Sequence, residues 1–235
     1  MHQQLITLFC ILLTFASYAL FRKLYNRYRH PLLNVVVLSA AAIIVVLLLL
    51  EIPYEAYQPA QDILTVLIGP ATVGLAVPLY RYRRLLVSRG VAIVLSVAAG
   101  SLLAMVTAAW IAAVGGLPGE VVMSIMPKGV SIPFAVEVAG MFGGIPALAA
   151  AFVVATGTLG SLLGAWTLSV FRITDPMGRG LALGTVSHAQ GTAVALQEGE
   201  LAGAMSGLAM ILAGIFTAGL APLVVPLMPL IPSLG

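Results

Sequence analysis

The chain has 235 residues, of which 61% are hydrophobic and only 8% are charged, and its mean hydropathy is +1.10. This composition predicts an integral membrane protein and excludes an ordinary soluble domain. The formal net charge of +3 comes from basic residues that flank apolar segments, so it reflects membrane topology and gives no reason to expect a nucleic-acid partner.

Six apolar segments are long enough to cross a bilayer, for which a helix needs about 20 residues. They are 5–21, 32–50, 60–80, 91–114, 145–171 and 201–231. We therefore expect an all-α, polytopic membrane protein with about six transmembrane helices. The single cysteine, Cys10, lies in the first segment, so the sequence contains no disulfide framework and no thiol cluster for a metal.

The basic residues indicate the orientation in the membrane. They follow the first and the third apolar segments, as Arg22, Lys23, Arg27 and Arg29 and then as Arg81, Arg83, Arg84 and Arg89. Cytoplasmic loops are enriched in Lys and Arg, so we expect both loops to be cytoplasmic. The loop between them, 51–59, contains Glu51 and Glu55 and no basic residue. The N-terminus is therefore expected outside.

Two short polar stretches interrupt the apolar sequence, Pro127-Lys128-Gly129-Val130-Ser131-Ile132-Pro133 and Gly184-Thr185-Val186-Ser187-His188-Ala189-Gln190-Gly191-Thr192. A broken backbone at membrane depth persists only where it faces a cavity or other protein. Paired breaks of this kind are typical of a transporter's binding site. We therefore expect segments 121–143 and 180–198 to be re-entrant hairpins or discontinuous helices that form the site.

The charge rule favours hairpins for these two segments. If 121–143 crossed the membrane completely, the loop with Arg172 and Arg179 would lie outside. If it enters and leaves on the outer face, ten of the eleven Lys and Arg residues are cytoplasmic and only Lys128 is not. Segment 180–198 then enters from the opposite face, which is inverted-repeat geometry. Crossing helices remain the alternative, because about 20 residues per segment also suffice to span.

Four stretches of the chain resemble the LrgB/CidB family: SIMPKGVSIPFAVEV, GGIPAL, ITDPMGRGLALGTVSHAQGTA and ELAGAMSGLAM. The resemblance covers nearly the whole chain and implies a bacterial inner-membrane protein, first described as an antiholin-like modulator of murein hydrolase export and cell lysis. Plastid relatives carry glycolate and glycerate, and bacterial relatives paired with a small LrgA/CidA-like subunit are linked to pyruvate uptake. This chain differs from many relatives at Gly129, Ile132 and Val194.

The residues of the breaks themselves suggest a site for a small carboxylate. Lys128 supplies a compact positive charge, and half-helices that begin near Ser131 and Thr192 would direct free amides towards an anion. Polar side chains that could contact a 2-hydroxy or 2-oxo group are Ser131, Thr185, Ser187, His188, Gln190 and Thr192. The alternative for Lys128 is snorkelling to the outer interface or an ion pair with Glu137.

Four residues are candidates for coupling or structural roles. His188 titrates near neutral pH and could carry a proton, or its neutral ring could tie the hairpin together by hydrogen bonds. Glu137 could be a coupling carboxylate or the counter-charge of Lys128. Asp175 and Arg179 could form a solvated ion pair, or Asp175 could cap a helix that starts at Pro176, and both could orient the second hairpin.

These patterns favour a secondary transporter of small monocarboxylates, with proton coupling as one option. The alternative is a holin-like or antiholin-like regulator of cell lysis. An enzyme is not expected, because the sequence has no GxSxG elbow and no zinc motif. For the same reason no metal or cofactor is expected.

The chain is expected to form one integral-membrane domain over residues 1–235. Within it, 1–59 would be scaffold spans and 60–235 the transport core with both breaks. A moving site needs a static support, so we expect a homo-oligomer, a complex with an LrgA/CidA-like subunit, or both. The first two spans are the expected contact elements.

Overall fold

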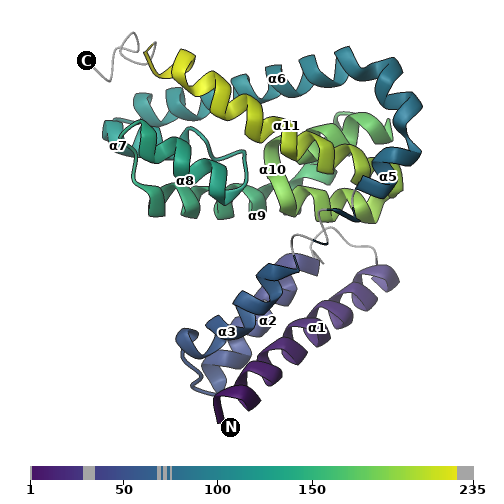
Figure 1. Ribbon diagram of the computed structural model, residues 1–235, viewed down its shortest axis with the longest axis vertical. Coiled ribbons are helices and arrows are strands. Elements are labelled where there is room, and N and C mark those ends of the chain that lie inside the picture. The colour runs from purple at the N-terminus through teal and green to yellow at the C-terminus, as the bar shows by residue number, and fades with distance from the viewer. Residues whose placement is uncertain (1, 29–34, 68–69, 71–72, 75, 227–235) are drawn as a thin grey trace. The chain divides into compact units, whose positions relative to one another are not determined.

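A computed structural model of the protein describes residues 2–28, 35–67, 70, 73–74 and 76–226 (Figure 1). Every regular element in these ranges is a helix. Four helices in the described part are long and apolar enough to cross a membrane: Gln3–Tyr28, Arg83–Val114, Pro146–Val170 and Glu200–Val224. The expected class, an all-α polytopic membrane protein, is confirmed.

The chain divides into two compact units, Met1–Val77 and Pro78–Gly235. The first unit contains α1 (His2–Tyr28), α2 (Val35–Leu49) and α3 (Tyr54–Val66). Thr14 on α1 and Tyr57 on α3 bring their hydroxyl oxygens within 3.2 Å of each other, which joins these two helices. The division of roles at residues 59 and 60 stays a prediction.

The third expected span, 60–80, differs from the helices observed in its place. Residues 54–59 were expected in a loop, but they begin α3, and α5 (Ala76–Arg81) is a separate helix. Pro53 immediately before the helix and Glu55 in its first turn are both helix-start signals, and the acidic side chain favours the positive helix end. Parts of three expected spans lie outside the described residues. They are 68–69, 71–72 and 75 of this segment, and 32–34 and 227–231 of two others.

The second unit contains the remaining helices. They are α6 (Arg83–Val114), α7 (Gly119–Ile125), α8 (Ile132–Met141), α9 (Pro146–Val170), α10 (Pro176–Glu198) and α11 (Glu200–Val224). Large apolar side chains cover much of the outer surfaces of α6 and α9, for example Val91, Ile111 and Trp166. Such surfaces suit contact with lipid.

The segment α10 is a hairpin and not one straight helix. His188 interrupts it with φ 42° and ψ −129°. Arg179 and Glu198, which lie 19 residues apart, form an ion pair. A straight helix would hold residues at that separation about 28 Å apart, so the chain must reverse direction at His188.

The contacts of α10 with α11 show the same reversal. In the first half, Gly180 and Gly184 lie against Ala202 and Ser206, so this half runs parallel to α11. In the second half, the Thr192 hydroxyl lies 3.0 Å from that of Ser206, and Leu196 packs on Gly203. The second half therefore runs antiparallel to α11.

The segment from α7 to α8 also folds back on itself. The backbone nitrogen of Ile145 donates a hydrogen bond of 2.7 Å to Ser124 Oγ, 21 residues earlier in the chain. A straight helix would separate these residues by about 31 Å. Residues 126–131 connect the two helices and form the tip of this first hairpin. Both broken segments thus have the hairpin form that the positions of the basic residues favoured.

The two hairpins approach from opposite ends of α9. At the N-terminal end of α9, Ile145 is bonded to Ser124 of the first hairpin. Towards the C-terminal end, Arg179 of the α10 hairpin donates to the carbonyl oxygen of Ala165 at 3.1 Å. The two hairpins of the second unit therefore enter from opposite ends, as the sequence predicted. Figure 1 shows α10 beside α9 and α11.

Glycines on α9 allow α10 to pack very closely. A Cβ atom built on Gly157 would lie 2.5 Å from His188 Cε1, and one on Gly164 would lie 2.7 Å from Leu183 Cδ2. Between them, Gly160 is covered by the hydroxyl of Ser187. Small residues at a membrane helix contact have this effect, because they let the backbones approach.

We predict that Gly184→Ala destabilises the protein, because the new methyl group would meet the backbone of Ser206 on α11. The two helices would have to separate, at a cost of at least about 2 kcal/mol. Thermal unfolding of the detergent-purified protein measures the effect. Gly90→Ala on α6, where no atom lies within 4 Å of the new position, is the control and should be neutral or stabilising by up to about 1 kcal/mol. Equal melting temperatures for the two variants would contradict the prediction.

Candidate functional site

The tips of the two hairpins meet beside the middle of α6. A Cβ atom built on Gly129 would lie 3.5 Å from the carbonyl oxygen of Thr185 and 4.0 Å from Ala104 Cβ. On the preceding turn of α6, a Cβ on Gly100 would lie 3.1 Å from Thr185 Cγ2. Gly100 and Ala104 both lie in the middle third of α6. The structure therefore brings the two predicted breaks together, and we call this contact the tip junction (Gly100, Ala104, Gly129 and Thr185).

Two helix ends of opposite polarity lie near the tip junction. The first half of α10 ends at His188, so the carbonyl groups of its last turn, including that of Thr185, form the negative end of a helix dipole. The helix α8 begins at Ile132 with Ser131 as its N-cap, and its first amides form a positive end. The start of a half-helix near Ser131 was predicted correctly.

Lys128 immediately precedes Gly129 at the tip junction and is partly buried. Among the described residues it forms no ion pair, and the ion pairs found there join Arg81 to Glu200 and Arg179 to Glu198. Glu137 is exposed on α8 and does not pair with Lys128, so the expected counter-charge contact is absent. A charge at this depth without a protein counter-charge can hold an anion.

His188 is only 5% exposed, and its Nε2 lies 3.1 Å from the carbonyl oxygen of Val153 on α9. Because a carbonyl oxygen only accepts, Nε2 carries the hydrogen of this bond. In this tautomer Nδ1 carries no hydrogen, so a proton taken up by the neutral ring would bind at Nδ1. The positive φ of 42° is uncommon for a residue other than glycine, so the surroundings hold His188 in a strained backbone conformation.

The two threonines of the second break use their hydroxyl groups within the protein. Thr185 Oγ1 donates to the carbonyl oxygen of Leu181 at 2.7 Å. Thr192 Oγ1 donates to the carbonyl oxygen of His188 at 2.9 Å and lies 3.0 Å from Ser206 Oγ. The second half of α10 begins directly after His188, so Thr192 lies inside this helix and not at its start as expected. Both threonines stabilise the hairpin.

The other polar residues of the second break lie against α9. A Cβ atom on Gly157 would lie 3.0 Å from Gln190 Cδ, and Ser187 covers Gly160. Gln190 Oε1 is buried and has no hydrogen-bond partner among the described residues. The candidate residues therefore form two groups: Lys128 and Ser131 on the first hairpin, and Ser187, His188 and Gln190 at the α9 contact.

Sequence reasoning missed two serines on neighbouring helices. Ser101 lies on α6 one residue after Gly100, is 2% exposed, and its Oγ has no hydrogen-bond partner in the described part of the chain. Ser206 lies on α11 and contacts Thr192. The only available signal was a single hydroxyl within an otherwise apolar span, and such a signal does not reveal which neighbour the hydroxyl faces.

A pocket of about 330 Å³ between α6 and α10 reaches the tip junction. Its lining includes Ser96, Gly100, Leu181, Thr185 and Val186. This volume is at the lower end of the range for small-molecule sites, about 300–1,000 Å³. The described residues contain no group of three His, Cys, Asp or Glu side chains that could hold a metal ion.

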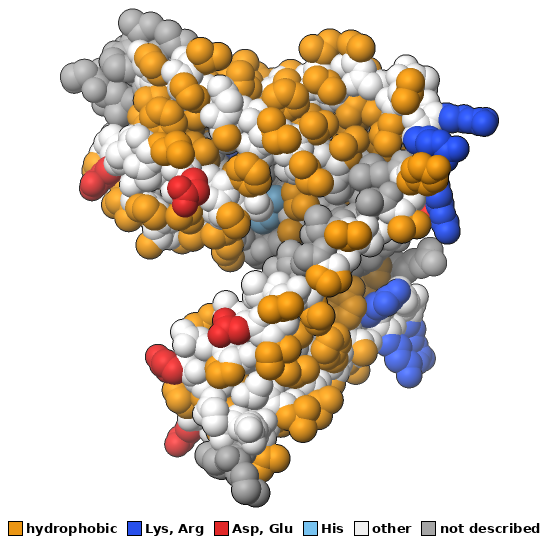
Figure 2. Space-filling view, in the orientation of Figure 1, with side chains coloured by type: hydrophobic (Ala, Val, Ile, Leu, Met, Phe, Trp, Pro, Cys, Tyr) orange, Lys and Arg blue, Asp and Glu red, His pale blue; other side chains and the backbone are white. Residues whose placement is uncertain are grey.

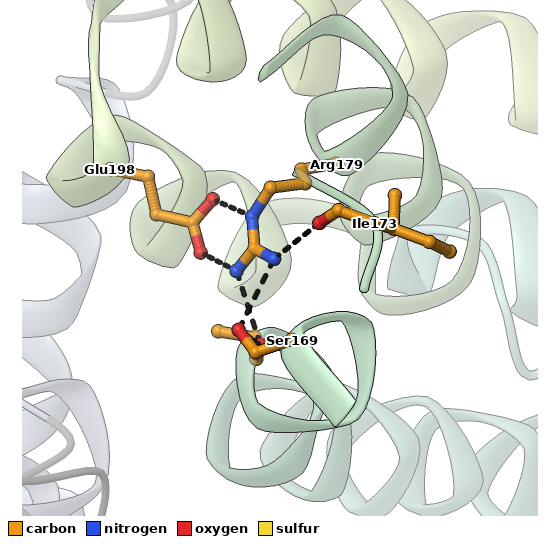
Figure 3. A network of polar contacts seen from close by, with 5 residues as sticks. Ser169, Ile173, Arg179 and Glu198 are labelled. Atoms are coloured by element: carbon orange, nitrogen blue, oxygen red, sulfur yellow. Dashed lines mark hydrogen bonds and ion pairs between the residues drawn. The ribbon is translucent and has the colours of Figure 1, made fainter. Parts of the chain in front are cut away.

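Arg179 joins the two ends of the α10 hairpin (Figure 3). It donates from Nε to Glu198 Oε2 at 2.7 Å and from Nη1 to the Ile173 carbonyl oxygen at 2.8 Å. The hydrogen bond to Glu198 raises the pKa of Arg179, so its charge is retained at any physiological pH. Asp175 accepts a 2.8 Å bond from the Gly178 amide, which is the expected helix cap, and it forms no ion pair with Arg179.

Basic side chains of the second unit gather towards one of its ends. Figure 2 shows basic side chains over α5 and the start of α6, and acidic side chains over α7 and α8. Arg179 lies at the same end as the first group, since Arg81 pairs with Glu200, which follows Glu198 by two residues. The end where the α10 hairpin enters is therefore the basic end.

The model of the LrgB-like family matches residues 14–227 of the chain. The chain belongs to the LrgB-like family. The match includes both hairpins and the tip junction.

Three similar proteins cover nearly the full chain. It is 36% identical to "Uncharacterized protein YxaC" of Bacillus subtilis over 96% of this chain and 98% of the relative. It is also 36% identical to "Uncharacterized protein YwbG" of the same organism, over 93% and 97%. An "Uncharacterized protein" of Haemophilus influenzae is 32% identical over 94% and 96%. No solved structure matches this LrgB-like chain significantly.

We predict that Arg179 and Glu198 are energetically coupled, because their bidentate contact closes the hairpin and their side chains are only 13% and 22% exposed. A double-mutant cycle with Arg179→Gln and Glu198→Gln, measured by thermal unfolding, should give a coupling free energy of about 1–3 kcal/mol. The same cycle on Arg81 and Glu200, with side chains 66% and 45% exposed, is the control and should give below about 1 kcal/mol. Similar values for the two pairs would show that the hairpin does not depend on this contact.

Proposed function

We propose that the protein is a secondary transporter of small monocarboxylates, the class of 2-hydroxy and 2-oxo acids that includes glycolate, glycerate and pyruvate. The observation that carries the proposal is Lys128, a cation for which the described residues provide no counter-charge, beside the junction of two hairpin tips. Membership in the LrgB-like family is compatible with this function.

The chemistry around Lys128 fits a carboxylate. A buried charge is costly unless it is paired, and a bound carboxylate would supply the pair. Ser131, three residues further on, makes no side-chain capping bond, so its hydroxyl group is not committed to the helix start and would be available to such a ligand. The first amides of α8, a helix of 10 residues, would add the positive end of its dipole.

The hairpin arrangement supports alternating access. Each hairpin enters from a different end of α9, and their tips meet beside α6. Withdrawal of one tip would open the junction towards one face of the membrane, while the other tip would keep it closed towards the opposite face.

The proposed setting is the bacterial inner membrane. The basic end of the second unit would face the cytoplasm and the N-terminus would lie outside, because cytoplasmic segments are enriched in Lys and Arg. The apolar outer surfaces of α1 and α2, including Leu5, Leu12 and Leu48, are proposed to contact lipid and a second subunit. That subunit would be another copy of the chain or an LrgA/CidA-like protein.

An antiholin-like role in murein hydrolase export is equally compatible with family membership. Uptake by the purified protein in lipid vesicles separates the two functions, because a lysis regulator need not carry a carboxylate.

We predict that Lys128→Ala weakens the binding of labelled glycolate, glycerate or pyruvate by about 10- to 100-fold, the usual loss when a hydrogen bond to a charged group is removed. Uptake into proteoliposomes measures the effect. Lys23→Ala, which removes an exposed lysine from α1, is the control and should leave uptake unchanged. Full uptake by Lys128→Ala, with normal yield and oligomeric state, would refute the proposed role of this side chain.

We predict that His188→Gln abolishes accumulation driven by a pH gradient but preserves much of the substrate exchange at equal pH. Glutamine retains a donor for the Val153 carbonyl but cannot carry a proton, and exchange needs no net proton movement. Both assays should be run on the same preparation. Parallel loss in both would assign His188 a structural role at the hairpin tip.

A further inference from the structure

Ser101 has a buried hydroxyl group that makes no hydrogen bond to a carbonyl oxygen of α6. Several other helical serines of this protein donate to a carbonyl oxygen of their own helix, as Ser124 does to Glu120 at 2.6 Å and Ser88 to Leu85 at 3.0 Å. Ser101, although only 2% exposed, makes no hydrogen bond within the described residues. Because an unbonded buried hydroxyl is unfavourable, this arrangement needs another explanation.

The position of Ser101 on α6 directs it towards the first hairpin. Residues four apart on a helix share one face, and Val97 and Met105 on either side of Ser101 are both buried. Val97 belongs to the same apolar cluster as Val130. Met105 packs in a cluster with Met126. Ser101 thus lies on α6 between two residues that share apolar clusters with the two ends of the hairpin tip.

The next turn of α6 confirms this placement. Ala104, three residues after Ser101, is the residue of α6 that approaches Gly129. Gly129 directly follows Lys128. The unbonded hydroxyl and the unpaired ammonium group are therefore both associated with the same tip, one on a long helix and the other on the hairpin.

The two groups supply complementary interactions to a carboxylate. A lysine is a flexible point charge that fixes little of its partner's orientation. A carboxylate has two oxygens that can accept several hydrogen bonds, so one charged donor leaves most of this capacity unused. A hydroxyl on a long helix adds a donor from a fixed direction.

We propose that Ser101 is a substrate-contacting residue that donates its hydroxyl hydrogen to the carboxylate bound by Lys128, so that α6 forms the fixed wall of the site. The inference rests on the proposed function, since it names a further residue of the same site.

The test compares ligand affinity with the stability of the free protein. Ser101→Ala should weaken the binding of glycolate or pyruvate to the purified full-length protein about 10- to 100-fold, as expected for one lost hydrogen bond to a charged group. The melting temperature of the ligand-free variant should stay equal or rise, because the substitution removes an unsatisfied buried hydroxyl. A structural hydroxyl would give the opposite result, a lower melting temperature. Ser88→Ala, on the exposed part of the same helix, is the matched control and should leave affinity unchanged.

A second measurement uses the thiol of Ser101→Cys in a Cys10→Ala background, where it is the only cysteine. Glycolate or pyruvate should slow its modification by a small methanethiosulfonate reagent, as followed by intact mass. If the wild type binds none of the carboxylates, the proposed function fails. If the wild type binds them and Ser101→Ala binds equally well, or if the ligand gives the thiol no protection, only the role of Ser101 is overturned.

Discussion

The hydrogen-bonding demand of the backbone governs the second unit of this protein. Amide and carbonyl groups at a helix break cannot be left in lipid, because nothing there replaces their lost partners. Two breaks therefore have to be enclosed by protein, and α6, α9 and α11 provide the enclosure. Close approach is possible because glycines occupy the tightest contacts, such as Gly184 against Ser206 and Gly160 against Ser187. The glycine positions thus allow the neighbouring helices to enclose the hairpins.

The same enclosure creates the chemistry of the site. Lys128 is held at a tip where the described protein offers no acidic partner, although Glu137 is only nine residues further along the chain. The acidic residues that do pair, Glu198 and Glu200, lie at the basic end of the unit, away from the tip junction, and stabilise its structure. In the function proposed above, the positive charge near the tip junction is the part of the site that would hold an external anion.

Sequence patterns predicted the features that depend on local chemistry. The apolar spans, the cap by Asp175 and the half-helix that starts after Ser131 all follow from residue types at short spacing. The positions of the basic residues correctly favoured hairpins over crossing helices. Features that depend on contacts between distant residues were missed, as with the pairing of Arg179 to Glu198, since a sequence alone does not show which of several acids a guanidinium reaches.

Two local errors have the same origin. The second half-helix was expected to begin near Thr192, but the packing of His188 on Val153 places the break four residues earlier. Ser101 was read as part of an apolar span, because its unbonded state exists only in the folded protein. The start of α3 at Tyr54 was missed for a different reason: residues 51–59 were assigned to the loop between two apolar segments, whereas the helix begins within them and includes Pro59.

The face of α9 that carries Gly157, Gly160 and Gly164 has a mechanical consequence. Helices usually resist axial sliding because the side-chain ridges of one fit into the grooves of the other. Here the row of glycines forms a groove on α9, and the side chains of Leu183, Ser187 and His188 of α10 fit into it. Two polar contacts add to this fit, that of His188 with the Val153 carbonyl at the tip and that of Arg179 with the Ala165 carbonyl near the base. Any movement of the hairpin along α9 would therefore have to lift these side chains out of the groove as well as break both polar contacts.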